Sequence, residues 1–162
     1  MRFLFAFLLA VVGSAPLAQS APLTLVRVWP GYRNTESFDR ISEYFTGREN
    51  PSRETILRTQ PAVRAGFYFL VRLENPGAVV AGAVFELHII SPTSPDAQLF
   101  TFKADLPAGS HAFNLGVTGT DWPGPKASAV AWFLTVRAPD GTELAQRQSF
   151  LWAMPDTPSP AK

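Results

Sequence analysis

The chain holds two histidines, the side chains best suited to acid–base chemistry or metal binding near neutral pH. His88 lies two residues after Glu86, so both fall on one side of an extended segment, where they could share a proton or bind a metal ion. No further ligand follows at metal-site spacing nearby. We therefore expect His88 and Glu86 to lie on the polar outer face of a sheet, with no metal bound.

The second histidine, His111, follows a turn at residues 107–109 and alternates with Phe113 and Leu115. We expect it to close one end of the core, with a ring nitrogen bonded to a backbone group. Ser110 is its neighbour in sequence, but adjacency does not orient two side chains for proton transfer. The Gly-x-Ser-x-Gly pattern of a serine nucleophile does not occur.

The remaining chemistry rests on carboxylates, which hydrolyse glycosides when a fold brings two of them within about 10 Å. Asp96, Asp105 and Asp121 are possible members of such a pair, although each falls at a strand end or in a loop. The absence of cysteine excludes thiol catalysis and cysteine-ligated zinc. Phosphate-binding, dinucleotide-binding and calcium-binding loops do not occur either. The sequence predicts a protein that is not an enzyme and needs no cofactor; a hydrolase is the second alternative.

An aromatic residue in a stiff loop is the first candidate for binding. Asp121 and Trp122 lie in Gly119–Pro125, a segment with prolines at 123 and 125. A rigid exposed tryptophan stacks on a sugar ring or fills a pocket of another protein. In the alternative interpretation, Trp122 folds back and caps the open end of the core.

A second candidate lies between residues 29 and 58, where Tyr32 and Arg33 precede a short predicted helix. Its apolar face would hold Phe38, Ile41, Tyr44 and Phe45. Tyrosine and arginine are enriched at binding hot spots, so Tyr32 and Arg33 join Trp122 and Asp121 as candidate contact residues. The alternative role for this segment is to cover an edge strand against aggregation.

These residues would be positioned by strands, because apolar residues alternate with polar ones along most of the chain. We expect strands at 23–29 (ending at a Pro30–Gly31 turn), 54–59, 67–74, 79–89, 99–106, 110–117, 130–136 and 144–152, with a loop at 91–96. This number and spacing of strands predicts an all-β fold, a two-sheet antiparallel sandwich of immunoglobulin or fibronectin type III kind with one short helix near its start.

The first twenty residues have the layout of a secretory signal peptide. Arg2 precedes an apolar run, residues 3–12, and small residues follow. The run is too short to span a membrane, which takes about 20 residues. We expect cleavage after Ser20, or alternatively after Ala18, and export to the periplasm or the exterior of a bacterial cell. The domain would then cover residues 21–152, followed by a disordered, proline-rich tail at 153–162.

Charge narrows the range of partners. Removing the first twenty residues takes one of the 14 Lys and Arg, so the mature chain has as many basic as acidic groups. Nucleic-acid-binding proteins carry a basic excess, so nucleic acid is excluded as a partner. The sequence predicts a binding or adaptor module of the cell envelope, with a protein or polysaccharide as partner and no membrane span. The nearest alternative is a carbohydrate-binding module.

Overall fold

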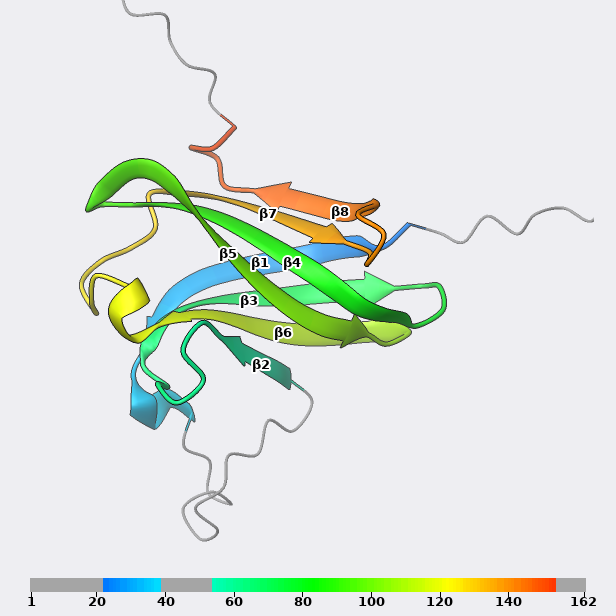
Figure 1. Ribbon diagram of the computed structural model, residues 1–162, viewed down its shortest axis with the longest axis horizontal. Coiled ribbons are helices and arrows are strands. Elements are labelled where there is room, and N and C mark those ends of the chain that lie inside the picture. The colour runs from blue at the N-terminus through cyan, green and yellow to red at the C-terminus, as the bar shows by residue number, and fades with distance from the viewer. Residues whose placement is uncertain (1–21, 39–53, 154–162) are drawn as a thin grey trace, which may run out of the picture.

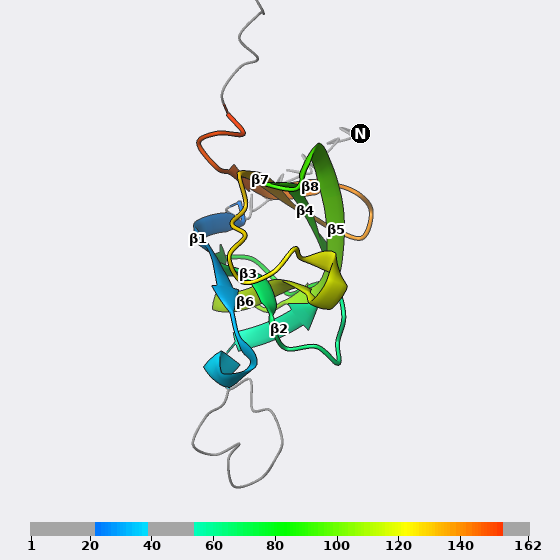
Figure 2. The same ribbon diagram turned by 90° about the vertical axis from the view of Figure 1, so that its left-hand side faces the viewer.

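A computed structural model of the protein describes residues 22–38 and 54–153. In these residues, eight strands form two four-stranded sheets that pack as two layers (Figures 1 and 2). Sheet A has the order β1-β3-β6-β2, and sheet B has the order β5-β4-β7-β8. The elements are β1 (Thr24–Arg33), the 3-10 helix η1 (Thr35–Phe38), β2 (Glu54–Arg58), β3 (Gly66–Asn75), β4 (Val80–Ser91), β5 (Ser94–Leu106), β6 (Gly109–Thr118), the 3-10 helix η2 (Gly119–Asp121), β7 (Ala131–Arg137) and β8 (Glu143–Gln148). The expected all-β sandwich is confirmed.

The core lies between the two sheets and is built from the alternating residues that the sequence pattern indicates. Each strand turns one side inward, so residues two apart share the buried face. The central strands contribute most of it: Phe67, Phe69, Val71 and Leu73 from β3, Phe85, Leu87 and Ile89 from β4, Phe113, Leu115 and Val117 from β6, and Trp132, Leu134 and Val136 from β7.

The strand pairing departs from the expected antiparallel pattern at one edge. β2 runs parallel to β6, with Glu54 beside Ala112 and Arg58 beside Gly116. All other pairs in the described residues are antiparallel. Alternation identifies a strand but carries no information on the direction of its neighbour, so the sequence pattern missed this parallel pair.

Two expected breaks in the chain are wrong. Pro30 and Gly31 do not form a turn but continue β1, paired with β3 as far as Arg33. Proline is tolerated there because β1 lies at the edge of sheet A and has no second neighbour that needs its missing N–H. The expected loop at 91–96 is also much shorter, since β4 ends at Ser91 and β5 begins at Ser94.

Three expectations fall partly or wholly outside the described residues. The signal peptide at residues 1–20 lies outside them, and so does the tail after Ala153. Of the expected helix, the structure describes only the first turn, η1, which is a 3-10 helix whose residue Phe38 is buried. After β8, residues 149–153 form a turn rather than a continuation of the strand.

Candidate functional site

Trp122 is buried, contrary to the expectation of an exposed stacking platform. Its side chain is 5% exposed, and its ring stacks on Phe67 with centroids 4.3 Å apart. The indole Nε1 donates a hydrogen bond to the carbonyl oxygen of Gly124 at 3.1 Å, so the loop closes over its own tryptophan. The ring therefore caps the end of the core, as in the alternative interpretation, and offers no face to a sugar. Asp121 is half-buried in η2.

Tyr32 also contributes to this end of the core. It pairs with Phe67 across β1 and β3 and packs against the core cluster that contains Trp122. The structure thus brings Tyr32 and Trp122 to the same side chain, Phe67, and half-buries Tyr32. These two candidate contact residues support the fold at one end of the sandwich.

Arg33 belongs to a cluster of cations and rings on the outer face of sheet A. Its guanidinium carbon lies 5.5 Å from the ring centroid of Phe38, and that of Arg58 lies 5.2 Å from the same ring. The ring of Phe38 also packs against Tyr68, with centroids 4.8 Å apart. Arg58 Nε donates to the Tyr68 hydroxyl at 2.8 Å, and this hydroxyl donates to the Arg64 carbonyl at 2.6 Å. These contacts fasten η1 onto the outer face of sheet A at the central strand β3, whereas the sequence analysis expected this segment to cover an edge strand.

The two histidines lie apart and have different neighbours. His111 Nε2 is 3.0 Å from the carbonyl oxygen of Ala108, which confirms the expected bond to a backbone group. His88 does not pair with Glu86, whose carboxylate accepts a hydrogen bond from Arg137 Nε at 2.8 Å. Among the described residues, no group of three or more His, Asp or Glu side chains could hold a metal ion.

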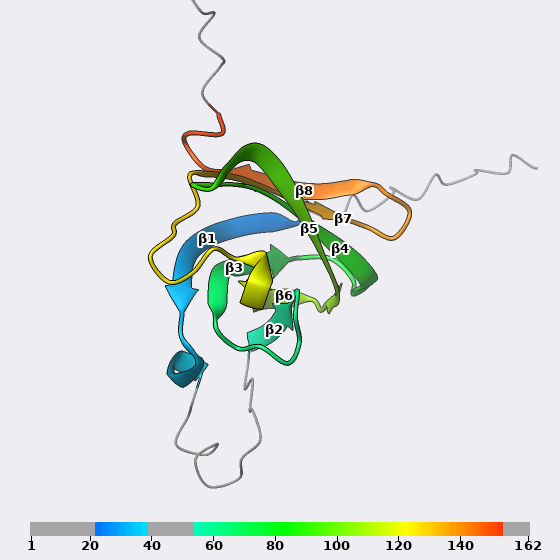
Figure 3. The ribbon, with the colours of Figure 1, turned by 60° about the vertical axis from the view of Figure 1, so that its left-hand side comes forward.

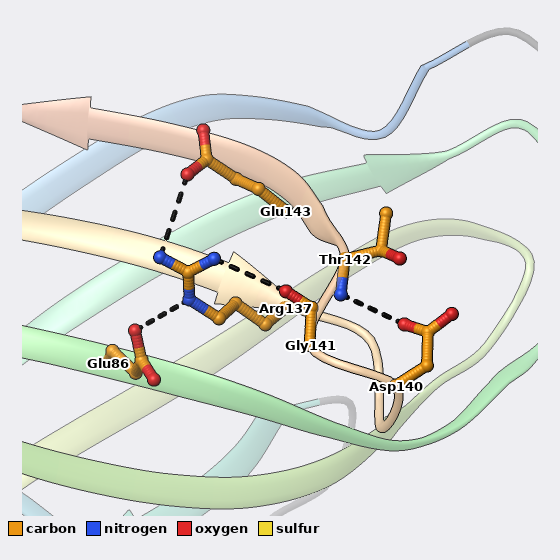
Figure 4. Close-up of polar contacts among 6 residues, drawn as sticks. All are labelled: Glu86, Arg137, Asp140, Gly141, Thr142 and Glu143. Atoms are coloured by element: carbon orange, nitrogen blue, oxygen red, sulfur yellow. Dashed lines mark hydrogen bonds and ion pairs between the residues drawn. The ribbon is translucent and has the colours of Figure 1, made fainter.

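Arg137 anchors a small polar network on the outer face of sheet B (Figure 4). Besides Glu86, it contacts Glu143 at 3.8 Å and donates to the Gly141 carbonyl at 3.3 Å. The hydrogen bond to Glu86, together with the charges of both carboxylates, raises the pKa of Arg137 above its ordinary value. The carboxylates are therefore held by a permanent cation, which suits a structural role better than proton transfer.

A cleft of about 400 Å³ lies between the start of β1, the β3–β4 turn and the start of β8. Its one ionisable side chain, Glu143, contacts Arg137. Its amide side chain, Asn75, donates to the backbone carbonyls of Ala78, Leu106 and Pro107. Asn75 thus holds the β3–β4 turn and Glu143 is paired with Arg137, so both polar side chains already have partners.

The outer face of sheet B carries an aromatic cluster that the sequence analysis missed. A cross-strand row joins Leu99 in β5, His88 in β4 and Phe133 in β7. The ring of Trp152 stacks on Phe133 with centroids 5.8 Å apart and lies 6.1 Å from the His88 ring. The sequence contained a sign of this cluster: Phe133 is an apolar residue at the outward-facing position between the inward-facing Trp132 and Leu134.

Two strongly exposed apolar side chains adjoin this cluster. Phe150 is 80% exposed and Leu151 is 52% exposed, in the turn at residues 149–153 that also holds Trp152. The turn is fixed to β7, since Ser149 N donates to the Trp132 carbonyl at 2.9 Å and Ser149 Oγ accepts from Trp132 N at 3.0 Å. Phe150, Leu151, Trp152, Phe133, His88 and Leu99 are called the outer patch below.

No protein-family model matches this chain, and no curated protein is significantly similar to it. Within the described residues, no helix is both long and apolar enough to cross a membrane. The outer patch holds Phe150, the most exposed large apolar side chain of the described residues, beside a stacked ring pair, and packing of the core does not require that exposure.

Proposed function

We propose that this protein is an exported, non-catalytic β-sandwich domain that binds another protein at the cell envelope through the outer patch. One observation carries the proposal: Phe150 and Leu151 are held exposed beside stacked aromatic rings, on a turn fixed to the sheet. Contiguous apolar surface on a folded domain is typical of a protein-binding site. Fixed aromatic anchors lose little conformational entropy on binding, which favours affinity.

A protein fits the outer patch better than a polysaccharide does. A sugar site needs an exposed ring beside hydrogen-bonding groups, whereas the most exposed members here, Phe150, Leu151 and Leu99, have no polar side-chain atoms. The tryptophan first considered for stacking on sugars, Trp122, is buried. An apolar pocket of a partner protein would cover Phe150 and Leu151 without leaving polar groups unpaired.

The strand order supports a finer assignment of the fold. Without β2, sheet A reads β1-β3-β6 and faces β5-β4-β7-β8, so seven strands remain in two sheets. We infer an immunoglobulin-like or fibronectin type III-like sandwich in which β2 is an addition between the first two strands of the common fold. Such domains are widespread as binding modules, although the fold alone does not establish a function.

Export rests on the first twenty residues, with Arg2 ahead of the apolar run at 3–12. The intact mass of the protein recovered from periplasm or medium tests it directly. We expect a chain that begins at Ala21, or at Gln19 if cleavage follows Ala18. A full-length mass in the cytoplasmic fraction would overturn the proposal of export.

The binding role is tested by capture from envelope and secreted fractions of the source organism, with the purified protein as bait. Phe150→Asp is the test variant, and Val79→Asp is its control. Val79 is likewise strongly exposed, but it lines the cleft at the β3–β4 turn. A partner bound by wild type and Val79→Asp should be lost about tenfold or more with Phe150→Asp, because hot-spot residues contribute about 2 kcal/mol or more.

Three results would contradict this proposal. Equal capture by both variants would place the binding surface elsewhere. Retention on insoluble polysaccharide, without a protein partner, would favour the carbohydrate-binding alternative. If nothing binds wild type in either assay, a structural role in the envelope replaces the adaptor role.

A further inference from the structure

Three of the four edge strands in the described sandwich are protected against pairing with another chain. β1 contains Pro30, and Arg147 of β8 donates to the backbone carbonyls of Leu25 and Val26 at 2.7 and 2.6 Å, where the register of β1 shifts. Figure 3 shows β1 passing beneath β7 and β8 of sheet B. β2 has five residues and β8 has six. Proline, bulges and short length are the common means by which proteins protect sheet edges.

The fourth edge strand, β5, has Pro95 and a bulge near its start, but none of these protections from Gln98 to Ala104. It has 13 residues and forms the outer edge of sheet B (Figure 2). Between Ala97 and Asp105, the backbone has no hydrogen-bond partner other than β4 in the part of the chain that the structure describes. One row of its N–H and C=O groups therefore faces outward, ready to pair with an added strand.

The residues of this open edge favour association. The segment Ala97–Phe102 has the sequence Ala-Gln-Leu-Phe-Thr-Phe, without charge, proline or glycine. On the outer face Leu99 is exposed, and on the inner face Phe100 is only partly covered by the core. A six-residue, uncharged segment of high β propensity on an exposed edge is typical of strand–strand association.

We propose that β5 pairs antiparallel with β5 of a second copy of this chain, forming a continuous eight-stranded sheet across a two-fold axis near Phe100. The side chain of Phe100 selects this occupant, because the core covers it only partly on the inner face. With the axis at Phe100, Asp96 lies opposite Ala104 and Lys103 opposite Ala97, so no like charges meet across the paired strands. The two-fold also brings the Phe100 side chains of the two copies together on the inner face, where each covers the other.

This dimer shares Leu99 with the outer patch, but it forms through the backbone edge of β5, and its test is separate from the Phe150→Asp test of the proposed function. Thr101 is an exposed member of β5 and lies within two residues of its own copy in the paired strands. With the axis at Phe100, a charged residue at this position would lie opposite Leu99 of the second copy and diagonally beside its like, and both placements disfavour pairing. Thr101→Lys should therefore separate the two copies without disturbing the core.

The control comes from the same cross-strand row. Thr101 pairs with Glu86, Glu86 with Thr135, and Thr135 with Gln146 on β8. Gln146→Lys thus adds the same charge, at an equally exposed position, on the opposite edge of the same sheet. The molar mass of each purified protein, measured by sedimentation equilibrium, distinguishes the two edges.

We expect wild type and Gln146→Lys to be dimers at about 100 μM and Thr101→Lys to be a monomer with unchanged circular dichroism. Because the chain has no cysteine, Thr101→Cys and Gln146→Cys provide a second readout. A short bifunctional thiol reagent should cross-link the first variant into dimers and leave the second as monomers. Monomeric wild type at this concentration, or a dimer that Gln146→Lys dissociates and Thr101→Lys does not, would overturn the proposal.

Discussion

The indole ring of Trp122 stacks on the phenyl ring of Phe67, with centroids 4.3 Å apart and planes 21° from parallel. This contact ties the loop between β6 and β7 to the central strand β3, far away in sequence. It turns a residue that resembled an exposed binding platform into part of the core. The first prediction depends on it.

Trp122→Ala should destabilise the protein by about 3–5 kcal/mol, because it removes a large buried ring and leaves a cavity beside Phe67. Trp29→Ala is the matched control, since Trp29 is exposed on β1 and contacts Arg27. Urea unfolding followed by circular dichroism measures both. A loss below about 1 kcal/mol for Trp122→Ala would show that the loop does not pack on the core in solution.

Two phenylalanines distinguish the folded core from the exposed surface. Phe69 is fully buried in β3, whereas Phe150 is 80% exposed. Phe69→Ala should lower the free energy of unfolding by about 3–5 kcal/mol, and Phe150→Ala by less than about 0.5 kcal/mol. Similar losses for the two variants would contradict the assignment of Phe150 to a binding surface rather than to the folded core.

Gly66 at the start of β3 cannot accept a side chain without movement of the backbone. A Cβ there would lie 2.4 Å from the Val117 carbonyl oxygen and 2.7 Å from the Thr118 Cα. We expect Gly66→Ala to cost about 1–3 kcal/mol in denaturant unfolding. Gly31→Ala has no atom within 4 Å of the new Cβ and should be neutral or stabilising by up to about 1 kcal/mol. Equal effects at both positions would mean that β3 and β6 are not packed as described.

The turn between β7 and β8 predicts a pH dependence. Thr142 N donates to Asp140 Oδ1 at 2.9 Å, and this backbone hydrogen bond lowers the pKa of Asp140 below its ordinary value (Figure 4). A lowered folded-state pKa stabilises the protein above the unfolded pKa of about 4, and the effect is lost as the pH falls through the folded pKa. Asp140→Asn should therefore lower the urea midpoint slightly at pH 7, and the difference from wild type should shrink as the pH falls below about 4. A difference that stays constant over this range would contradict the prediction.

The sequence by itself determined the fold class and most of the core. Alternation in segments such as 67–74 and 79–89 identified the buried side of each strand, because apolar residues recur every two positions in a strand that has one buried face and one face in solvent. The same local logic predicted that His111 bonds a backbone group. These features depend on near neighbours in the chain.

Tertiary structure alone decided which exposed-looking residues are covered. Trp122 is buried by Phe67, and Tyr32 packs at the same end of the core, both through contacts between segments distant in sequence. It likewise decided that β2 runs parallel to β6 and that β5 is left as the open edge. A residue pattern records what each strand can bury, but which strands meet, and in which direction, depends on the packing of the whole chain.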